Sequence, residues 1–355
     1  MQLLVDILPV LSREERFALK GGTAINLFER DLPRLSVDID LTWLPVQDFE
    51  TDVVAISVAL EHLAETFRAR PLQLQVQTSG GVKTGGITRL ICSRGRARVQ
   101  IEASPVMRGA VHPVRTMTVQ PAVEQTFGFA STQVLDFADL YAGKLAAALS
   151  RQHPRDLFDI GLPLDDERLG ETLWHSFLVY LTCSPKPAWE MLAPREPVDF
   201  DTIFDAHFKG MTAEPVTAAQ LLETRTRLLS WISDRLDEAS CAFLWSVEDE
   251  DPDLGLIGLE RAAALPGIGR KLQNLARRSQ VKRRADRLQM AQMLKLRAAR
   301  VASVPTRAKA SSATSSATRV HSCVQVRNVD LNPGAMPRGA YRRPGLTAWW
   351  PASYA

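Results

Sequence analysis

The chain has 355 residues, of which 45% are hydrophobic and 23% charged, and its formal net charge at pH 7 is +3. Such a composition is that of an ordinary soluble protein, long enough for two domains with their own cores. No apolar run reaches the ~20 residues of a membrane-spanning helix, and the first residues lack the basic region and cleavage site of a secretory signal. We therefore expect a cytoplasmic protein without a membrane partner, whose four single cysteines are reduced.

The basic residues are concentrated towards the C-terminus. Residues 271–300 hold 10 basic and 1 acidic residue and residues 301–355 hold 7 and 1, which leaves 26 basic and 38 acidic residues, a charge of −12, before position 271. A basic helix of this kind binds RNA phosphates or is simply a solvated face, and the sequence leaves both open. The residues concerned are Arg277, Arg278, Lys282, Arg283, Arg284 and Arg287.

The most informative pattern lies in residues 20–41, where a paired-glycine turn opens an amphipathic helix over 24–30 and an alternating strand follows. Gly21 and Gly22 let the backbone approach a phosphate, and a helix that starts there points free N–H groups at the anion. Side chains alternate along a strand, so Asp38 and Asp40 share one face. Either feature alone is more often a plain turn or a solvated strand, but together they favour a nucleotide and metal site.

Two carboxylates on one strand face repel each other unless a cation lies between them. Hard oxygen ligands suit Mg²⁺, which typically binds through one or two carboxylates together with substrate phosphates. We therefore predict that Asp38 and Asp40 bind Mg²⁺. The glycine turn, with Thr23 in the helix and Ser36 on the strand face of the acids, is then predicted to bind a nucleoside triphosphate.

The next segment predicts a helix over 52–68 and strands over 72–76, 87–92 and 97–103, of which the last two form a hairpin. On the last strand, Glu102 lies on the polar face. A third acid on a neighbouring strand suits a two-metal nucleotidyl site, so Glu102 is a candidate metal ligand. The alternative is an exposed glutamate at a strand end.

Residues 136–151 have the alanine and leucine content of a helix. Lys144 and Arg151 are two turns apart and project on nearly the same face, where an ammonium and a guanidinium suit triphosphate oxygens. In the next helix, Asp156 and Asp159 lie three residues apart. Two roles stay open for these acids: pairing with the cations that hold the helices in register, or direct contact with nucleotide or acceptor.

These residues carry a family resemblance. The run LKGGTAINLF followed by PRLSVDIDL resembles the first motif of the AbiEii/AbiGii toxin family, nucleotidyltransferases of the DNA polymerase β-like fold that includes the MenT-type toxins. Residues 136–160 resemble its second block, and the stretches around 207–212 and 265–275 resemble its helical C-terminal half. In the family, the glycine turn holds the triphosphate and the Asp-x-Asp pair binds the metals. Lys144 and Asp156 or Asp159 then occupy the motif positions after the metal site.

The resemblance implies an α/β fold in which a mixed-sheet nucleotidyltransferase domain, residues 1–125, precedes an all-helical domain, residues 126–295. Residues 296–355 form a basic tail that is expected to be disordered, because its Ser-, Ala- and Pro-containing stretches lack periodicity.

The implied function is that of a Mg²⁺-dependent nucleotidyltransferase toxin from a toxin–antitoxin or phage-defence system, with a cognate antitoxin as a possible partner. MenT-type relatives transfer nucleotides to the acceptor end of tRNA, so a tRNA 3′ end is the leading acceptor. One alternative is transfer to a protein hydroxyl. Another is an inactive module that binds a nucleotide or an antitoxin, against which the intact Asp38, Asp40 and Lys144 argue.

Overall fold

The structure, a computed structural model, describes residues 1–80, 85–161, 164 and 168–302. Residues Met1–Val301 form one compact unit. The predicted domain boundary at residue 125 falls inside this unit and stays a prediction. The predicted disordered tail extends beyond Ala302, and that part of it lies outside the described residues.

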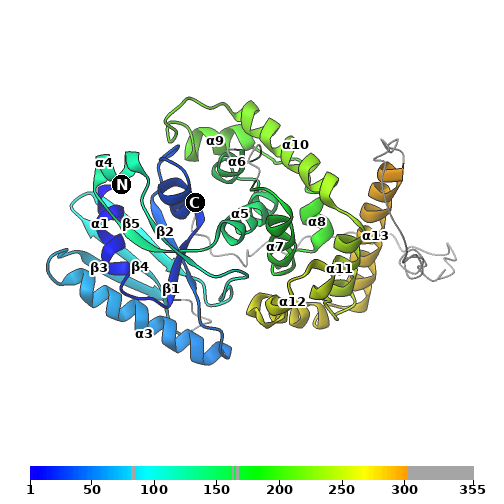
Figure 1. Cartoon of the computed structure of the whole chain (residues 1–355), viewed down its shortest axis with the longest axis horizontal. Coiled ribbons are helices and arrows are strands. Elements are labelled where there is room, and N and C mark those ends of the chain that lie inside the picture. The colour runs from blue at the N-terminus through cyan, green and yellow to red at the C-terminus, as the bar shows by residue number, and fades with distance from the viewer. Residues whose placement is uncertain (81–84, 162–163, 165–167, 303–355) are drawn as a thin grey trace, which may run out of the picture. The chain divides into compact units, whose positions relative to one another are not determined.

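A seven-stranded mixed sheet forms the N-terminal half of this unit, in the order β3-β4-β5-β2-β1-β7-β6 (Figure 1). Strand β2 pairs antiparallel with β1 and parallel with β5, and β1 pairs parallel with β7. The predicted α/β fold with a mixed sheet is confirmed. Strands β1, β6 and β7 had no counterpart in the sequence analysis, and the strand predicted over 72–76 lies further along the chain, as β3. The strands are β1 (Phe17–Lys20), β2 (Asp38–Trp43), β3 (Gln75–Gly80), β4 (Ile87–Arg94), β5 (Ala97–Ala103), β6 (Arg115–Thr118) and β7 (Ser131–Val134).

One face of the sheet is apolar and packs against α1 (Gln2–Leu11) and α3 (Phe49–Arg68), as Figure 1 shows for α3. The predicted helix over 52–68 is confirmed, and it begins earlier because the side chain of Asp48 accepts a hydrogen bond from the backbone N–H of Thr51 at 2.9 Å. Ile39 and Ile101 are fully buried on this face. The alternate strand positions therefore project to the opposite, polar face.

The C-terminal half is helical, as predicted. A capping box formed by Thr217 and Gln220 is present at the start of α10. No described helix is long and apolar enough to cross a membrane. The helices of the chain after α3 are α4 (Pro121–Phe127), α5 (Phe137–Arg151), α6 (Pro154–Gly161), α7 (Glu171–Thr182), α8 (Ala188–Leu192), α9 (Phe200–His207), α10 (Ala218–Arg235), α11 (Glu238–Glu248), α12 (Pro266–Ala276) and α13 (Gln280–Ala302), with 3₁₀ turns at Leu254–Ile257 and Glu260–Ala264.

A short backbone pairing joins the helical half to the segment that leads into β2. The N–H of Leu35 donates to the carbonyl of Met211 at 2.8 Å, and the N–H of Ala213 donates to the carbonyl of Pro33 at 3.1 Å. The loop after α9 therefore fixes the residues just ahead of the predicted metal-binding strand.

Candidate active site

Strand β2 places the two predicted metal-binding acids on the polar face of the sheet. Asp38 is in register with Gln100 of β5, and Asp40 is in register with Glu102 of β5 on one side and Lys20 of β1 on the other. Directly paired residues share a face of a sheet. The structure therefore brings Asp38, Asp40 and Glu102 to one face, in agreement with the alternation of the sequence.

The glycine turn lies directly against these acids. Gly21 has a φ of +72°, and a Cβ at this position would lie 2.6 Å from Oδ2 of Asp40, so only glycine fits here. A Cβ on Gly22 would lie 2.5 Å from Nη2 of Arg34. The helix begins at Gly21 as α2 (Gly21–Ala24) and continues as a π-helix over Ile25–Glu29, three residues earlier than predicted.

Thr23 and Ser36 hold the glycine turn against the start of β2. Their hydroxyl oxygens lie 2.7 Å apart, and the Thr23 hydroxyl donates to the carbonyl of Asp38. Both side chains are buried. The two hydroxyls thus fix the position of the turn relative to Asp38, and their contact with a nucleotide stays a prediction.

Lys20 is a site residue that the sequence analysis missed. Burial lowers the pKa of Lys20, and the neighbouring Asp40 and Glu102 partly counteract this. No motif identifies Lys20, because only the register between β1 and β2 shows which acid it faces.

The carboxyl group of Asp40 responds to several charges at once. Burial raises its pKa, Lys20 opposes this rise and Glu102 adds to it. Lys144 and Arg151 lower the pKa of Asp40 as well. The two cations predicted to clamp a triphosphate therefore lie close enough to the acid strand to act on it electrostatically.

A buried ion-pair network holds these cations. Nζ of Lys144 lies 3.1 Å from Oδ1 of Asp156 and 2.9 Å from Oδ2 of Asp159, and Nη2 of Arg151 lies 2.8 Å from Oδ2 of Asp156. Burial disfavours the charged form of Asp156, but Arg151 and Lys144 outweigh this and lower its pKa to about 2. Of the two roles left open for these acids, the described contacts show the pairing role.

Arg34 completes the network and was also missed from the sequence. Its Nε and Nη2 donate to the two oxygens of Asp159 at 2.7 and 2.6 Å, and both residues are buried. Burial opposes ionisation of Asp159, yet Arg34 and Lys144 hold its pKa below the usual range. Since 125 residues separate Arg34 from Asp159, no local spacing signals this pair.

Glu102 is engaged by neighbours on the sheet. Nη2 of Arg89 lies 3.1 Å from its Oε2, and Nε2 of Gln100 donates to the same oxygen at 3.3 Å. Among the described residues, no three His, Cys, Asp or Glu side chains are arranged to hold a metal ion. Asp38, Asp40 and Glu102 share a face of the sheet, and the ligand role of Glu102 stays a prediction.

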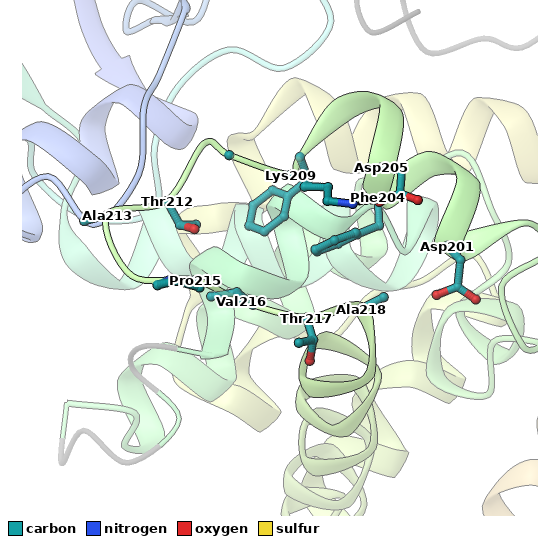
Figure 2. A pocket seen from close by; sticks show the side chains of 12 residues that line it. Asp201, Phe204, Asp205, Lys209, Thr212, Ala213, Pro215, Val216, Thr217 and Ala218 are labelled. Atoms are coloured by element: carbon teal, nitrogen blue, oxygen red, sulfur yellow. Dashed lines mark hydrogen bonds and ion pairs between the residues drawn. The ribbon is translucent and has the colours of Figure 1, made fainter.

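A separate cavity of about 480 Å³ lies between α9 and the first turn of α10 (Figure 2). Phe204 and Phe208 contribute its aromatic surface, and Lys209 and Thr212 come from the loop that pairs with residues 33–35. None of the predicted site residues lines this cavity.

Paired acids beside a glycine turn, with a lysine and an arginine close enough to act on one of them, form the arrangement predicted for a nucleotidyltransferase. The family model described as nucleotidyl transferase AbiEii toxin, type IV toxin–antitoxin system, matches residues 2–243. The chain therefore belongs to the AbiEii family of nucleotidyltransferase toxins, which confirms the resemblance and the predicted enzyme class.

The solved structure of MenT4, a nucleotidyltransferase toxin from Mycobacterium tuberculosis H37Rv, matches with a TM-score of 0.51 and 17% sequence identity, over 77% of this chain and 92% of that chain. This likeness shows a shared fold. A search of curated proteins gave no match.

Proposed function

We propose that this toxin uses Mg²⁺ to transfer a nucleotide from a nucleoside triphosphate to the 3′ end of a tRNA. The observation that carries the proposal is the position of Asp38 and Asp40 on one face of β2, with Gly21 packed against Asp40. Nucleotidyl transfer needs a cation site beside a phosphate site, and the residues proposed for the two sites, Asp40 and Gly21, lie in contact.

The residues at the site fit a divalent metal. Asp38 and Asp40 offer hard oxygen donors on adjacent positions of one strand face, and Mg²⁺ is commonly held by one or two carboxylates plus substrate phosphates. The raised pKa of Asp40, caused by burial and by Glu102, marks a place where added positive charge is favourable. Bound there, Mg²⁺ would neutralise charge on the triphosphate and activate the attacking hydroxyl.

The remaining residues bind and orient the triphosphate. The backbone of Gly21, Gly22 and Thr23 approaches the phosphates where side chains are excluded. Lys144 and Arg151 supply positive charge near Asp40, and their shared partner Asp156 limits the positions they adopt. Ser36 supports the turn through its hydrogen bond to Thr23.

The reaction is an in-line displacement at the α-phosphorus. The acceptor oxygen forms the new P–O bond, its proton passes to solvent, and the bond to pyrophosphate breaks. In this proposal, Lys144 and Arg151 stabilise the charge on the departing pyrophosphate.

The tRNA acceptor and the cognate antitoxin come to this chain from its family and are part of the proposal, as is its cytoplasmic location. Transfer to a protein hydroxyl is the competing possibility.

The test incubates the purified protein with each labelled nucleoside triphosphate, Mg²⁺, and either total RNA or RNase-treated lysate. We expect the label to enter an RNA of tRNA size, with no transfer by Asp40→Asn. Label in a protein band would show that the acceptor is a protein and not an RNA. No label in any acceptor, with normal triphosphate binding, would contradict the transfer activity.

A further inference from the structure

The sheet carries a second basic region, inside the part of the chain whose net charge is −12. Residues 66–101 contain no Asp or Glu. One of their basic residues, Lys83, lies outside the described residues. The described ones occur at the end of α3 and along the β4–β5 hairpin, and the full set is Arg68, Arg70, Lys83, Arg89, Arg94, Arg96 and Arg98. The excess of basic residues is therefore not confined to the C-terminus.

This region forms the β3–β4–β5 end of the sheet, whose two faces differ sharply. Leu90 and Cys92 of β4 and Val99 of β5 are buried towards α3 and the core. The alternate positions form rows across the strands, and these rows are polar. One row is Gln75, Ser93 and Arg98; the next is Gln77, Ile91, Gln100 and Asp38; the third is Ser79, Arg89, Glu102, Asp40 and Lys20.

The polar rows are accessible to solvent. Gln75, Gln77, Ser79 and Arg98 are exposed, and the β4 positions between them are partly exposed. A sheet face with only one apolar side chain, Ile91, among these rows is poorly suited to covering by a helix. The exposed face is continuous with the predicted metal site, since the second row ends in Asp38 and the third row contains Asp40.

We infer that this face, defined by Gln75, Gln77, Ser93 and Arg98, binds the single-stranded end of the RNA acceptor. The inference rests on the proposed function and names the surface that it needs. Arg98 is one strand away from Asp38 and two residues along, so their Cα atoms are about 8 Å apart. A nucleotide next to the reacting 3′ end would therefore reach it.

The chemistry of the face favours RNA over a protein segment. Glutamine amides and serine hydroxyls both donate and accept hydrogen bonds, which matches base edges and ribose 2′-hydroxyls. Arginine matches phosphate oxygens. A protein partner would instead be expected to bury apolar side chains, of which the rows offer one, or to add a strand to the edge of β3.

The experiment compares two double variants with equal change of charge. Arg96→Glu with Arg98→Glu alters the exposed hairpin, and Arg277→Glu with Arg284→Glu alters exposed residues of the C-terminal basic segment. Binding of bulk tRNA is measured by fluorescence anisotropy in EDTA at several salt concentrations. Binding of a fluorescent triphosphate and the melting temperature are measured alongside.

For the hairpin variant we expect tRNA affinity to fall about tenfold and the salt slope to fall by about 1.4, which corresponds to two phosphate contacts on a single strand. Triphosphate binding and melting temperature should not change, and the matched variant should bind tRNA like the wild type. Arg98→Gln should show a smaller loss of tRNA affinity. This single variant takes the place of the hairpin double variant if the double variant does not fold.

Equal tRNA binding by the hairpin variant and the wild type would overturn this inference and leave the proposed function standing if the wild type still labels RNA. An equal loss of tRNA affinity in both double variants would also overturn the inference, because such a result would reflect the net charge of the protein and not a particular surface. Label in a protein band in place of RNA would overturn both proposals.

Discussion

Arg34 and Asp159 form a bidentate ion pair in which both side chains are buried, with donor–acceptor distances of 2.7 and 2.6 Å. Asp159 also lies 2.9 Å from Nζ of Lys144. The backbone of Leu35, next to Arg34, is held by Met211. The position of Lys144 therefore depends on a residue before β2 and, through it, on the loop after α9.

Replacing Arg34 by Lys keeps the charge but removes the planar fork. We expect Arg34→Lys to lower the free energy of unfolding by about 2 kcal/mol, because a lysine cannot make both of the hydrogen bonds that Arg34 donates to the buried carboxylate. Urea unfolding measures this. Arg16→Lys is the matched control, since Arg16 also pairs with a carboxylate through two nitrogens but is 47% exposed, and its loss should stay below about 1 kcal/mol. Equal losses in the two variants would contradict a special role for the buried pair.

Asp40→Asn should abolish transfer, with a loss of at least about 100-fold, because it removes a charged ligand from the predicted metal site. Its melting temperature should be equal to or above that of the wild type, since burial and Glu102 disfavour the charge on Asp40 in the metal-free protein. Labelled-triphosphate transfer and thermal unfolding test the two parts. Asp205→Asn on α9, which removes an exposed carboxylate paired with Lys209, should retain activity. A folded Asp40→Asn variant with normal turnover would rule out the metal assignment.

Lys144→Ala should impair both stability and triphosphate use. A lysine that served only to bind phosphate would lie outside the core, whereas Lys144 is buried between two carboxylates. Its removal takes one cationic partner from each of Asp156 and Asp159, which should lower the free energy of unfolding by about 3 kcal/mol. Urea unfolding and triphosphate binding on the folded fraction separate the effects. Normal triphosphate binding by that fraction would assign Lys144 to the scaffold alone.

The sequence was sufficient where function depends on local spacing. The alternation around Asp38 and Asp40, the glycine turn and the helix that carries Lys144 and Arg151 all follow from periods of two or 3.6 residues. It was insufficient where function depends on pairing between distant segments. Lys20 meets Asp40 through strand register, and Arg34 meets Asp159 across the unit, so neither contact has a local signal.

Protonation of Asp156 should make the protein less stable in acid. Its pKa is lowered from 3.8 to about 2 in the folded state, so its stabilising contribution is present above pH 4 and is lost as the pH falls through about 2. The difference corresponds to roughly 2 kcal/mol. Urea unfolding between pH 2 and 5 measures it, and Asp156→Asn should show a shallower pH dependence over this range. An unchanged slope would show that Asp156 is not held ionised by Lys144 and Arg151.

The basic segment at the start of α13 should contribute to stability more than to RNA binding. Arg278 pairs with Asp286, Arg283 pairs with Glu250, and Asp286 also accepts from Nε1 of Trp189 at 3.1 Å. These contacts fasten α13 to the helical half, so Arg278 and Arg283 are only partly available to a polyanion.

Reversing both residues, Arg278→Glu with Arg283→Glu, should lower the free energy of unfolding by about 1 kcal/mol for each pair, because each change places like charges together at a partly exposed contact. The exposed Arg277 and Arg284 provide the matched control, and their reversal should leave the unfolding midpoint within the error of the wild type. Thermal and urea unfolding measure both variants. If Arg278→Glu with Arg283→Glu unfolds like the wild type but binds tRNA less tightly, α13 is an RNA-binding helix, and the ion pairs do not fasten it.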